Sequence, residues 1–328
     1  MGSMLLPAFE LHEPRTVEEA AGLARDLGPG KFDFLAGGTD LLPNYKWTLN
    51  ARPHVISLLR VAGIDTISPT RIGALATLKR IEGSESLAKA LPVIPKTAAL
   101  IASPLIRASG TLGGNLMLEN RCFFFNQSEP WRASKGYCMK ADGDVCLVVP
   151  QKEICYATFS ADLPAPLIAL GASIELVSAE GKRVVPLSSF YAGDGIARNS
   201  KKPGEILSGV VLQQEAQRLR ASYQKLRLRD SWDFPEAGVA VAARSQGGVV
   251  EELRLVSNAM EMTPRVHDDL TSNYVGRPWA KEWIDELSQK VMESVRPVKN
   301  TFFSPEYRKR MTKVLARRAL LEVSGPVG

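Results

Sequence analysis

The sequence of 328 residues contains no long apolar stretch and no block of like charges. No apolar run approaches 18 residues, so the sequence predicts no membrane-spanning helix. The net charge is +6, but nowhere do five like charges follow one another, and the densest basic patches are at residues 307–310 and 317–318. Because no recognised nucleic-acid-binding motif accompanies these patches, we expect no nucleic-acid partner and a surface that faces solvent or another protein.

Cysteine is absent from most of the chain, and the only four, Cys122, Cys138, Cys146 and Cys155, fall in one segment. Two disulfides would need an oxidising compartment, but the N-terminus carries no signal peptide, so we expect a cytoplasmic protein. Four thiolates suit a structural zinc ion or an iron–sulfur cluster. Successive cysteines are separated by 15, 7 and 8 residues, without the C-x2–4-C pairs usual at zinc sites. Spacing alone leaves zinc and a cluster almost equally favoured, ahead of buried inert thiols.

Aromatic and polar side chains alternate around the cysteines. An aromatic wall would keep water from a cluster, and backbone or amide N–H groups would tune it. The same aromatic residues could instead form the core of a small structural segment. The residues concerned are Phe123, Phe124, Phe125, Trp131 and Tyr137, interleaved with Asn126, Gln127, Ser128 and Arg132.

Histidine is scarce as well. The three histidines, His12, His54 and His267, are scattered along the chain and form no motif. We assign them no role, since histidines at the surface or with satisfied hydrogen bonds are more common than metal ligands.

The chain has no G-x-G-x-x-G fingerprint followed by an acidic residue, so a Rossmann site is not supported. It has instead two Gly-Gly turns about 75 residues apart, at residues 36–40 (AGGTD) and 111–115 (TLGGN). Backbone N–H groups at such turns can face an anion with no Cβ in the way. One Gly-Gly turn is a weak signal, but two suit the pyrophosphate of a dinucleotide such as FAD.

The hydrophobic pattern predicts a mixture of helices and strands, with a boundary in the polar segment 213–220. For the first helix, residues 16–27, Thr16 is the expected N-cap and Glu19 completes a capping box. Residues 1–3 look like an added leader before Met4, and residues 325–328 like a frayed tail. The other expected helices are 79–91, 96–109, 278–295 and 304–323. The expected strands are 32–35, 55–58, 173–178, 183–187, 205–212, 222–229 and 248–258, with a strand and turn over 71–78 and a stretch of small apolar residues at 236–244.

Several segments in a fixed order resemble a known family over nearly the whole chain. They are residues 34–43 (FLAGGTDLLP), 107–115 (RASGTLGGN), 159–172 (FSADLPAPLIALGA), 204–207 (GEIL), 225–233 (KLRLRDSWD) and 307–310 (YRKR). Together they resemble the FAD-binding medium subunits of the molybdenum hydroxylases, the family of xanthine dehydrogenase and CO dehydrogenase. The cysteine-bearing loop, with residues 120–122 (NRC), 126–128 (NQS), 131–132 (WR) and 136–138 (GYC), resembles that of the β subunits of 4-hydroxybenzoyl-CoA reductases, which hold an extra [4Fe–4S] cluster.

The resemblance implies an α+β fold. It consists of a two-part FAD-binding domain of the vanillyl-alcohol-oxidase/PCMH-like type with a cysteine-rich insert, followed by a small C-terminal α+β domain. The implied boundaries are 1–57 and 58–215 for the two halves of the FAD-binding domain, with the iron–sulfur loop at 120–156, and 216–328 for the C-terminal domain.

The resemblance also implies a role for particular residues, none of them catalytic. Taken alone, Ile101 and Leu207 would be core residues, Lys225 a surface lysine, and Asp162 a helix N-cap or turn residue. Within the family, Ile101 would pack beside FAD, Asp162 and Leu207 would lie near the flavin and ribityl chain, and Lys225 would approach the isoalloxazine. The pyrophosphate and ribityl chain would be wrapped by Leu35, Ala36, Gly37, Gly38, Thr39, Asp40, Leu41, Leu42, Thr111, Leu112, Gly113, Gly114 and Asn115, and the cluster held by Cys122, Cys138, Cys146 and Cys155.

The implied function is electron transfer in a larger enzyme. The partners would be a large molybdopterin-binding subunit and a small subunit with two [2Fe–2S] clusters, assembled as a dimer of heterotrimers. Electrons from ferredoxin or a similar low-potential donor would pass through this subunit for the reductive dehydroxylation of 4-hydroxybenzoyl-CoA to benzoyl-CoA. Two alternatives stay open: the medium subunit of a molybdenum hydroxylase that oxidises an aromatic or heterocyclic substrate, and a zinc-stabilised flavoprotein interaction subunit.

Overall fold

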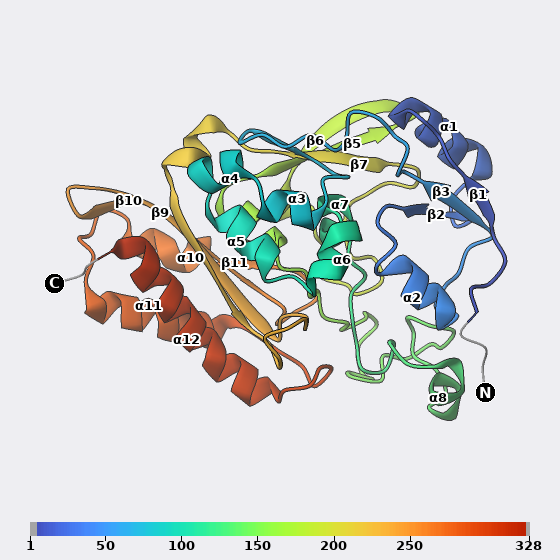
Figure 1. Cartoon of the computed structure of the whole chain (residues 1–328). Helices are drawn as coiled ribbons and strands as arrows, with labels where there is room; N and C mark the ends of the chain where they lie inside the picture. Colours follow the sequence, from blue (N-terminus) through green and yellow to red (C-terminus); the bar gives the residue numbers. More distant parts are fainter. Residues whose placement is uncertain (1–4, 326–328) are drawn as a thin grey trace.

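The computed structural model describes residues 5–325 and has an α+β architecture with three sheets (Figure 1). The expected leader at residues 1–3 and the end of the expected tail, residues 326–328, lie outside the described residues. No helix in the described part of the chain is both long and apolar enough to cross a membrane.

The N-terminal unit is a three-stranded parallel sheet in the order β1-β3-β2 (Glu10–His12, His54–Ser57 and Phe32–Leu35) with helices α1 (Val17–Leu27) and α2 (Leu41–Lys46). Helix α1 places its buried alanines, Ala20, Ala21 and Ala24, in one cluster with Ile56 of β3. The N-cap prediction is confirmed, since the Thr16 side chain accepts from the Glu19 N–H. A capping box would require the Glu19 carboxylate to accept from the N–H of the N-cap residue, Thr16. It accepts instead from the N–H of Arg15, one residue earlier, at 2.7 Å.

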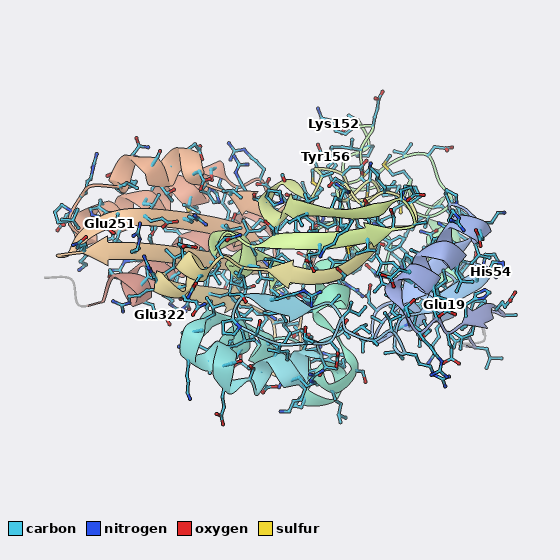
Figure 2. All side chains as sticks on the ribbon, turned by 90° about the horizontal axis from the view of Figure 1, so that it is seen from above. Glu19, His54, Lys152, Tyr156, Glu251 and Glu322 are labelled. Carbon is cyan, nitrogen blue, oxygen red and sulfur yellow. The ribbon has the colours of Figure 1, made fainter. Side chains whose placement is uncertain are left out.

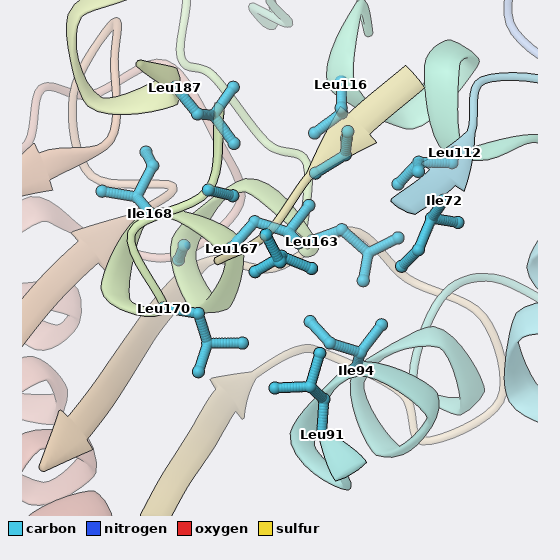
Figure 3. Packing of buried hydrophobic residues seen from close by; sticks show 14 of the residues in the cluster. Ile72, Leu91, Ile94, Leu112, Leu116, Leu163, Leu167, Ile168, Leu170 and Leu187 are labelled. Atoms are coloured by element: carbon cyan, nitrogen blue, oxygen red, sulfur yellow. The ribbon is translucent and has the colours of Figure 1, made fainter. Parts of the chain in front are cut away.

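The second unit is a four-stranded antiparallel sheet in the order β4-β7-β5-β6 (Arg71–Gly73, Ile206–Val211, Ser173–Ser178 and Gly181–Pro186). Its large core joins this sheet to the surrounding helices, and Figure 3 shows Ile72 of β4 and Leu167 among the clustered side chains. The expected hairpin is confirmed as β5 and β6. The helices of this unit are α3 (Leu78–Glu82), α4 (Glu85–Ala90), α5 (Val93–Ala99), α6 (Pro104–Ser109), α7 (Leu112–Leu116) and α9 (Pro164–Ala169), with the 3-10 turn η1 (Leu187–Ser189).

Two helices expected in this unit are each divided in two. The helix predicted over 79–91 breaks at Gly83, because Ser84 caps a new helix by accepting from the Leu87 N–H. The helix predicted over 96–109 breaks where Ala102 has φ of 45° and Ser103 caps α6. A serine followed by proline is a helix start signal, and the apolar pattern of the segment conceals it.

The C-terminal unit is a second four-stranded antiparallel sheet, β11-β10-β9-β8 (Arg265–Val266, Val249–Asn258, Ala237–Gln246 and Arg220–Leu226). Helices α11 (Lys281–Ser294) and α12 (Pro305–Ser324) pack on it and share its core. Figure 2 shows Glu251 of this sheet at one end of the molecule and His54 of the N-terminal unit at the other. The short elements of this part are η2 (Gln214–Arg218), α10 (Asp268–Thr271) and η3 (Ser272–Tyr274).

The segment that carries the cysteines is nearly without regular structure and contains only the short helix α8 (Glu129–Ser134). In Figure 1 it lies beside α2, below the sheet of the second unit. Buried polar groups fix its ends to the fold: the Asn120 side chain donates to Ala157 O and Met262 O, both at 2.9 Å, and Asn300 Nδ2 donates to Tyr156 O. The segment is thus attached to both the second and the C-terminal units.

Candidate cofactor sites

The two Gly-Gly turns lie against each other. A Cβ on Gly37 would collide with the backbone carbonyl of Ser109, and a Cβ on Gly110 would lie 3.5 Å from Thr39 Oγ1. The first turn therefore packs directly on the segment that leads into the second, and glycine at position 37 is required by this close backbone approach.

The two turns differ in how their backbone N–H groups are used. Within residues 5–325, no hydrogen bond is found for the N–H groups of Gly37, Gly38 and Thr39, and Gly38 has a positive φ of 71°. A left-handed residue in such a turn points successive N–H groups toward one side, as in an anion-binding nest. The N–H groups of the second turn are occupied: Gly113 donates to Ala74 O at 2.8 Å, and Gly114 donates to Thr111 Oγ1 at 3.1 Å.

The other residues singled out from the sequence gather beside these turns. Lys225 Nζ donates to Leu100 O at 3.0 Å, next to Ile101, and to the Asp162 carboxylate at 3.1 Å. The side chain of Asn115 accepts from the N–H of Leu163 at 3.2 Å. Leu207 lies on β7 in the core cluster that also contains Ile101.

Lys225 is not the surface lysine that its sequence context alone suggests. The side chains of Lys225 and Asp162 are each only 3% exposed, and Tyr223 O–H donates to Asp162 at 2.9 Å. Burial raises the pKa of Asp162 and lowers the pKa of Lys225, and the attraction between the two groups opposes both shifts. Strand β8 of the C-terminal unit thus reaches the neighbourhood of the glycine turns with Tyr223 and Lys225.

A second site is formed by the cysteines. All four are free and buried, with exposed fractions of 8%, 6%, 4% and 5% for Cys122, Cys138, Cys146 and Cys155. They line one small cavity of about 10 Å³, room for roughly one water molecule. The cavity is completed by Phe124, Phe125, Met139, Lys140, Leu147, Val148 and Ala157.

The aromatic wall expected around the cysteines is only partly formed. Phe124 and Phe125 line the cavity, but Phe123 is 56% exposed. Phe123 and Phe124 instead contact the Trp131 ring at centroid distances of 5.9 and 6.1 Å. Phe124 and Phe125 therefore exclude water from the thiols, and Phe123 and Trp131 form an outer cluster with Phe124.

Sulfur ionisation is opposed by burial and favoured by nearby N–H groups. Burial raises the pKa of Cys122 to about 12, while the N–H groups of Phe124 and Phe125 act against it. Burial likewise raises the pKa of Cys155 to about 11, and the Ala157 N–H, which donates to Cys155 Sγ at 3.4 Å, opposes the shift. The thiolate form in this pocket therefore needs a bound cation to offset desolvation.

Lys140 places a buried positive charge at the cavity. Its side chain is 4% exposed, pairs with Glu119 at 2.6 Å and also donates to Gly195 O. Gly195 in turn leaves room for sulfur, because a Cβ there would lie 2.7 Å from Cys155 Sγ. Sequence reasoning missed Lys140 and Gly195; the position of Lys140, two residues after Cys138, was the available signal.

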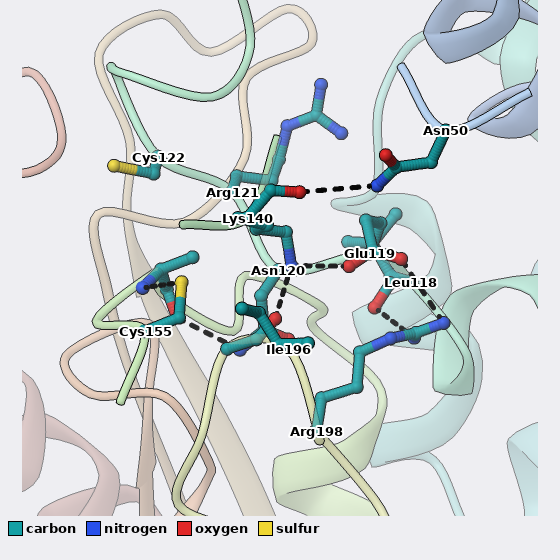
Figure 4. Close-up of polar contacts among 12 residues, drawn as sticks. Asn50, Leu118, Glu119, Asn120, Arg121, Cys122, Lys140, Cys155, Ile196 and Arg198 are labelled. Carbon is teal, nitrogen blue, oxygen red and sulfur yellow. Dashed lines mark hydrogen bonds and ion pairs between the residues drawn. The ribbon is translucent and has the colours of Figure 1, made fainter. Parts of the chain in front are cut away.

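Charged groups join the cysteine loop to the first glycine turn, and Figure 4 shows one part of this network, the contact between Arg198 and Glu119. Arg121 pairs with Asp40 at 2.6 Å, and the N–H of Glu119 donates to the same carboxylate at 3.4 Å. Arg198 pairs with Glu119 at 3.3 Å. A continuous polar network thus runs from Lys140, at the thiols, to Asp40, at the glycine turn.

Comparison with known proteins assigns the chain to a family. Residues 7–212 match the family described as FAD binding domain in molybdopterin dehydrogenase, and residues 221–323 match the CO dehydrogenase flavoprotein C-terminal domain. The chain belongs to this family of FAD-binding medium subunits of molybdopterin-dependent hydroxylases.

Relatives align with the chain over almost its full length. The carbon monoxide dehydrogenase medium chain of Afipia carboxidovorans is 28% identical, with 97% of each chain covered. The xanthine dehydrogenase FAD-binding subunit of Escherichia coli O157:H7 is 24% identical over 97% of this chain and 96% of its own. A structure of reconstituted CO dehydrogenase from Oligotropha carboxidovorans superposes with a TM-score of 0.79 at 26% identity, covering 98% of this chain and 99% of that one.

The donor groups present suit both cofactors that the sequence suggests, and the cysteine cavity, at about 10 Å³, is smaller than a cluster. For FAD, the free N–H groups at residues 37–39 and the left-handed Gly38 form a cradle suited to a phosphate oxygen. For a cluster, the cavity offers four sulfurs, N–H donors to two of them and the positive charge of Lys140. Asn126 Nδ2 is in addition a buried donor with no hydrogen-bond partner among the described residues, beside Cys122, whose N–H donates to the same amide.

Proposed function

We propose that this chain is the FAD- and [4Fe–4S]-carrying electron-transfer subunit of a 4-hydroxybenzoyl-CoA reductase. The observation that carries the proposal is the gathering of all four cysteines of the chain, buried, around one cavity next to the glycine turns. The family supplies the flavin, and the cysteine cavity supplies a ligand set for a second redox centre.

The spread of the sulfurs favours a cluster over a single zinc ion. Tetrahedral zinc with bonds of about 2.3 Å holds its sulfurs about 3.8 Å apart. Within residues 5–325, only one group of three possible ligand atoms lies within 4.8 Å of one another, and it contains no cysteine. No three of the four cysteine sulfurs are therefore that close together. A cubane spaces its ligands more widely than one ion does, and the loop would have to widen the present cavity of about 10 Å³ to hold it.

The protein groups around the two sites have separable tasks. When bound, FAD supplies one- or two-electron exchange, and an iron–sulfur cluster supplies one-electron exchange. Phe124 and Phe125 exclude water, and Lys140 offsets the negative charge of four thiolates. The Arg121–Asp40 pair connects the cysteine loop to the first glycine turn, so it helps to keep the relative position of the two sites fixed.

We propose the following division of the chain for this function. Residues 1–57 and 58–215 form the two halves of a vanillyl-alcohol-oxidase/PCMH-like FAD-binding domain, residues 120–156 form a cysteine-rich insert, and residues 216–328 form the C-terminal domain. The FAD contacts are Ile101, Asp162, Leu207, Lys225, and the residues of the two turns, 35–42 and 111–115. The partners are a large molybdopterin-binding subunit and a small subunit with two [2Fe–2S] clusters, in a cytoplasmic dimer of heterotrimers, with ferredoxin or a similar protein as electron donor.

The relatives favour one other function. The names of the relatives include carbon monoxide dehydrogenase and nicotine 6-hydroxylase, the latter 26% identical, which are oxidising enzymes. The medium subunit of an oxidative hydroxylase with an aromatic or heterocyclic substrate is therefore the second candidate. In that case electrons from the oxidised substrate leave the enzyme through this chain, and a redox centre in the cysteine cavity passes them to an external electron acceptor.

One experiment separates these functions. The complex is purified without oxygen together with the subunits encoded beside this one, and its iron, zinc, molybdenum and flavin are quantified. We expect FAD and four iron atoms beyond those of the small subunit, an EPR signal from a reduced [4Fe–4S] cluster, and formation of benzoyl-CoA from 4-hydroxybenzoyl-CoA with reduced ferredoxin. Stoichiometric zinc without the additional iron would instead identify a zinc-stabilised flavoprotein, and oxidation of a heterocycle without dehydroxylation would identify the second candidate.

A further inference from the structure

Two of the three histidines in the chain meet at the end of the molecule opposite the C-terminal sheet, where Figure 2 labels His54. His12 Nε2 and His54 Nδ1 are 3.2 Å apart. The carboxylate of Glu10 reaches both rings, with distances of 3.4 Å to His54 Nδ1 and 3.8 Å to His12 Nε2. Three ligand atoms of different side chains therefore converge within 4.8 Å of one another.

Strand pairing explains this convergence. Strands β1 and β3 are parallel neighbours, with Glu10 opposite His54 and His12 opposite Ile56. Residues 10 and 12 lie on the same face of β1 because side chains alternate along a strand. The Glu10 N–H donates to Pro53 O at 2.8 Å, which fixes the register next to His54. The interpretation of His12 and His54 as scattered residues without a role is therefore incomplete, because a separation of 42 residues hides the pair in the sequence.

The spacing of these atoms agrees with the coordination shell of a transition metal. A tetrahedral zinc ion with bonds of about 2.0–2.2 Å holds neighbouring ligand atoms about 3.3–3.6 Å apart. The two histidine nitrogens are 3.2 Å apart, Glu10 Oε2 is 3.4 Å from His54 Nδ1, and Glu10 Oε1 is 3.8 Å from His12 Nε2. These separations lie close to the interval, with a different carboxylate oxygen facing each histidine. Two imidazoles and one carboxylate are the donors of many zinc, copper and nickel sites, whereas magnesium and calcium prefer oxygen alone.

We propose that Glu10, His12 and His54 bind a divalent transition metal of the zinc class, with at least one coordination position open to solvent. The two histidine side chains are 18% and 27% exposed, and that of Glu10 is 66% exposed, so the site can be loaded from solution. The metal would connect β1 to β3 and would be separate from the cysteine cavity, whose lining contains none of these three residues. The proposal is independent of the function of the cysteines.

The test is a metal titration of the full chain with matched variants. Zn²⁺ is titrated into the wild type, Glu10→Gln, His54→Gln and Glu13→Gln. Glu13 is a suitable control because it is a neighbouring carboxylate that pairs with Arg60 at 3.3 Å and not with either histidine. We expect His54→Gln and Glu10→Gln each to weaken binding by at least about tenfold, the smallest loss seen when even an outer-shell partner is removed, with Glu13→Gln unchanged. Thermal unfolding without metal checks that each variant is folded.

Cobalt distinguishes this site from the cysteines, which could bind the same ions. Co²⁺ at Glu10, His12 and His54 gives ligand-field absorption without the thiolate charge-transfer bands that cysteine ligands produce. We expect wild type to show one such equivalent, and His54→Gln to lose it while any thiolate bands persist. The proposal is overturned if wild type and His54→Gln bind the same number of equivalents with the same affinity, if all Co²⁺ absorption is of the thiolate type, or if Glu13→Gln weakens binding as much as Glu10→Gln.

Discussion

At the scale of single residues, the glycines of the second turn have different reasons to be glycine. A Cβ on Gly113 would approach Ala74 Cβ to 2.9 Å, so this residue is fixed by packing inside the protein. Gly114 has one close neighbour, Thr111 Oγ1, which a Cβ would approach to 3.2 Å. Replacement of Gly114 therefore tests contact with a ligand, whereas replacement of Gly113 tests folding.

We expect Gly114→Val to lower the FAD content of the purified protein while the fold is kept. A branched side chain would occupy the space beside the turn that a phosphate or ribityl chain would use. The measurement is the ratio of flavin to protein absorbance, with circular dichroism to check the fold. Gly22→Val is the matched control, since Gly22 lies in helix α1 with nothing within 4 Å of a built Cβ. Full FAD in Gly114→Val would show that the turn does not contact the cofactor.

His267 makes stability depend on pH. It is 1% exposed, and its ring nitrogens lie 2.9 Å from Ser257 Oγ and 3.3 Å from Ser294 Oγ. Burial lowers its pKa from 6.5 to about 4, so below pH 6.5 the unfolded chain binds a proton that the folded chain does not. The neutral, buried His267 therefore contributes about 3 kcal/mol to the free energy of unfolding. This contribution is fully present above pH 6.5 and is lost as the pH falls toward 4.

The corresponding experiment is urea unfolding of wild type and His267→Asn between pH 7 and pH 4.5. Asparagine keeps a hydrogen-bonding side chain but does not titrate in this range. We expect the difference in free energy of unfolding between the two proteins to shrink as the pH falls. A difference that is constant over the whole range would show that His267 is accessible to protons in the folded state.

At the scale of elements, hydrophobic pattern and capping residues predicted most strands and the long helices. The strands at 32–35 and 173–178 agree with the structure in both bounds, as does the N-cap Thr16. Short elements were missed, among them α2, α7 and α8, because five or six residues give no readable period. The contacts between segments could not be predicted either: Lys225 on β8 and Asp162 are 63 residues apart, and only the folded sheet shows that they form a buried pair.

The Asp162–Lys225 pair connects β8 of the C-terminal unit to the start of α9. We expect Lys225→Met to cost about 3–5 kcal/mol of stability, because it leaves the Asp162 carboxylate buried without its cation. The double variant Asp162→Leu, Lys225→Met should cost less than the sum of the two single changes, since no charge is then left unpaired. Urea unfolding measures all four proteins. As a control, Arg229→Met breaks the pair with Asp233, in which the arginine is 58% exposed, and should cost less than about 1 kcal/mol of stability. If the stability costs of the changes at 162 and 225 were additive, the two residues would not form a coupled buried pair.

The cysteine loop has too little regular structure to keep one shape by itself. Only α8 lies between Cys122 and Cys155, so we expect a bound cluster to order the loop. Cys138→Ala should lose the cluster iron and make residues 120–156 sensitive to protease, while FAD stays bound because the glycine turns lie outside the loop. Iron and flavin analysis with limited proteolysis measures these effects. Loss of FAD together with iron would show that the two sites do not fold independently; unchanged iron would remove Cys138 from the ligand set.

At the scale of the whole molecule, the chain is the FAD-binding medium subunit of a molybdenum-containing oxidoreductase. Neither of the two sites offers a catalytic group for an organic substrate: the glycine turns present backbone donors, and the cysteine cavity is about 10 Å³ and lined mainly by thiols and apolar side chains. Both sites lie where units of the fold meet, with β8 reaching the glycine turns and Asn300 fixing the cysteine loop. We propose that the substrate chemistry occurs on partner subunits, an arrangement that agrees with the names of the medium-chain relatives.

We therefore expect this chain to form a stable complex with a large molybdopterin-binding subunit and a small iron–sulfur subunit, and the complex to dimerise. Exposed apolar side chains, including Leu105 at 85% and Phe302 at 72%, are available for such contacts. Native mass spectrometry of the three co-expressed chains should give the mass of two copies of each. Phe302→Asp should weaken assembly if Phe302 lies in an interface. Trp47→Asp, at an apolar residue that is only 36% exposed, serves as the comparison variant. A free chain that by itself reduces or oxidises the substrate would contradict the division of tasks between subunits, because it would place the organic chemistry here.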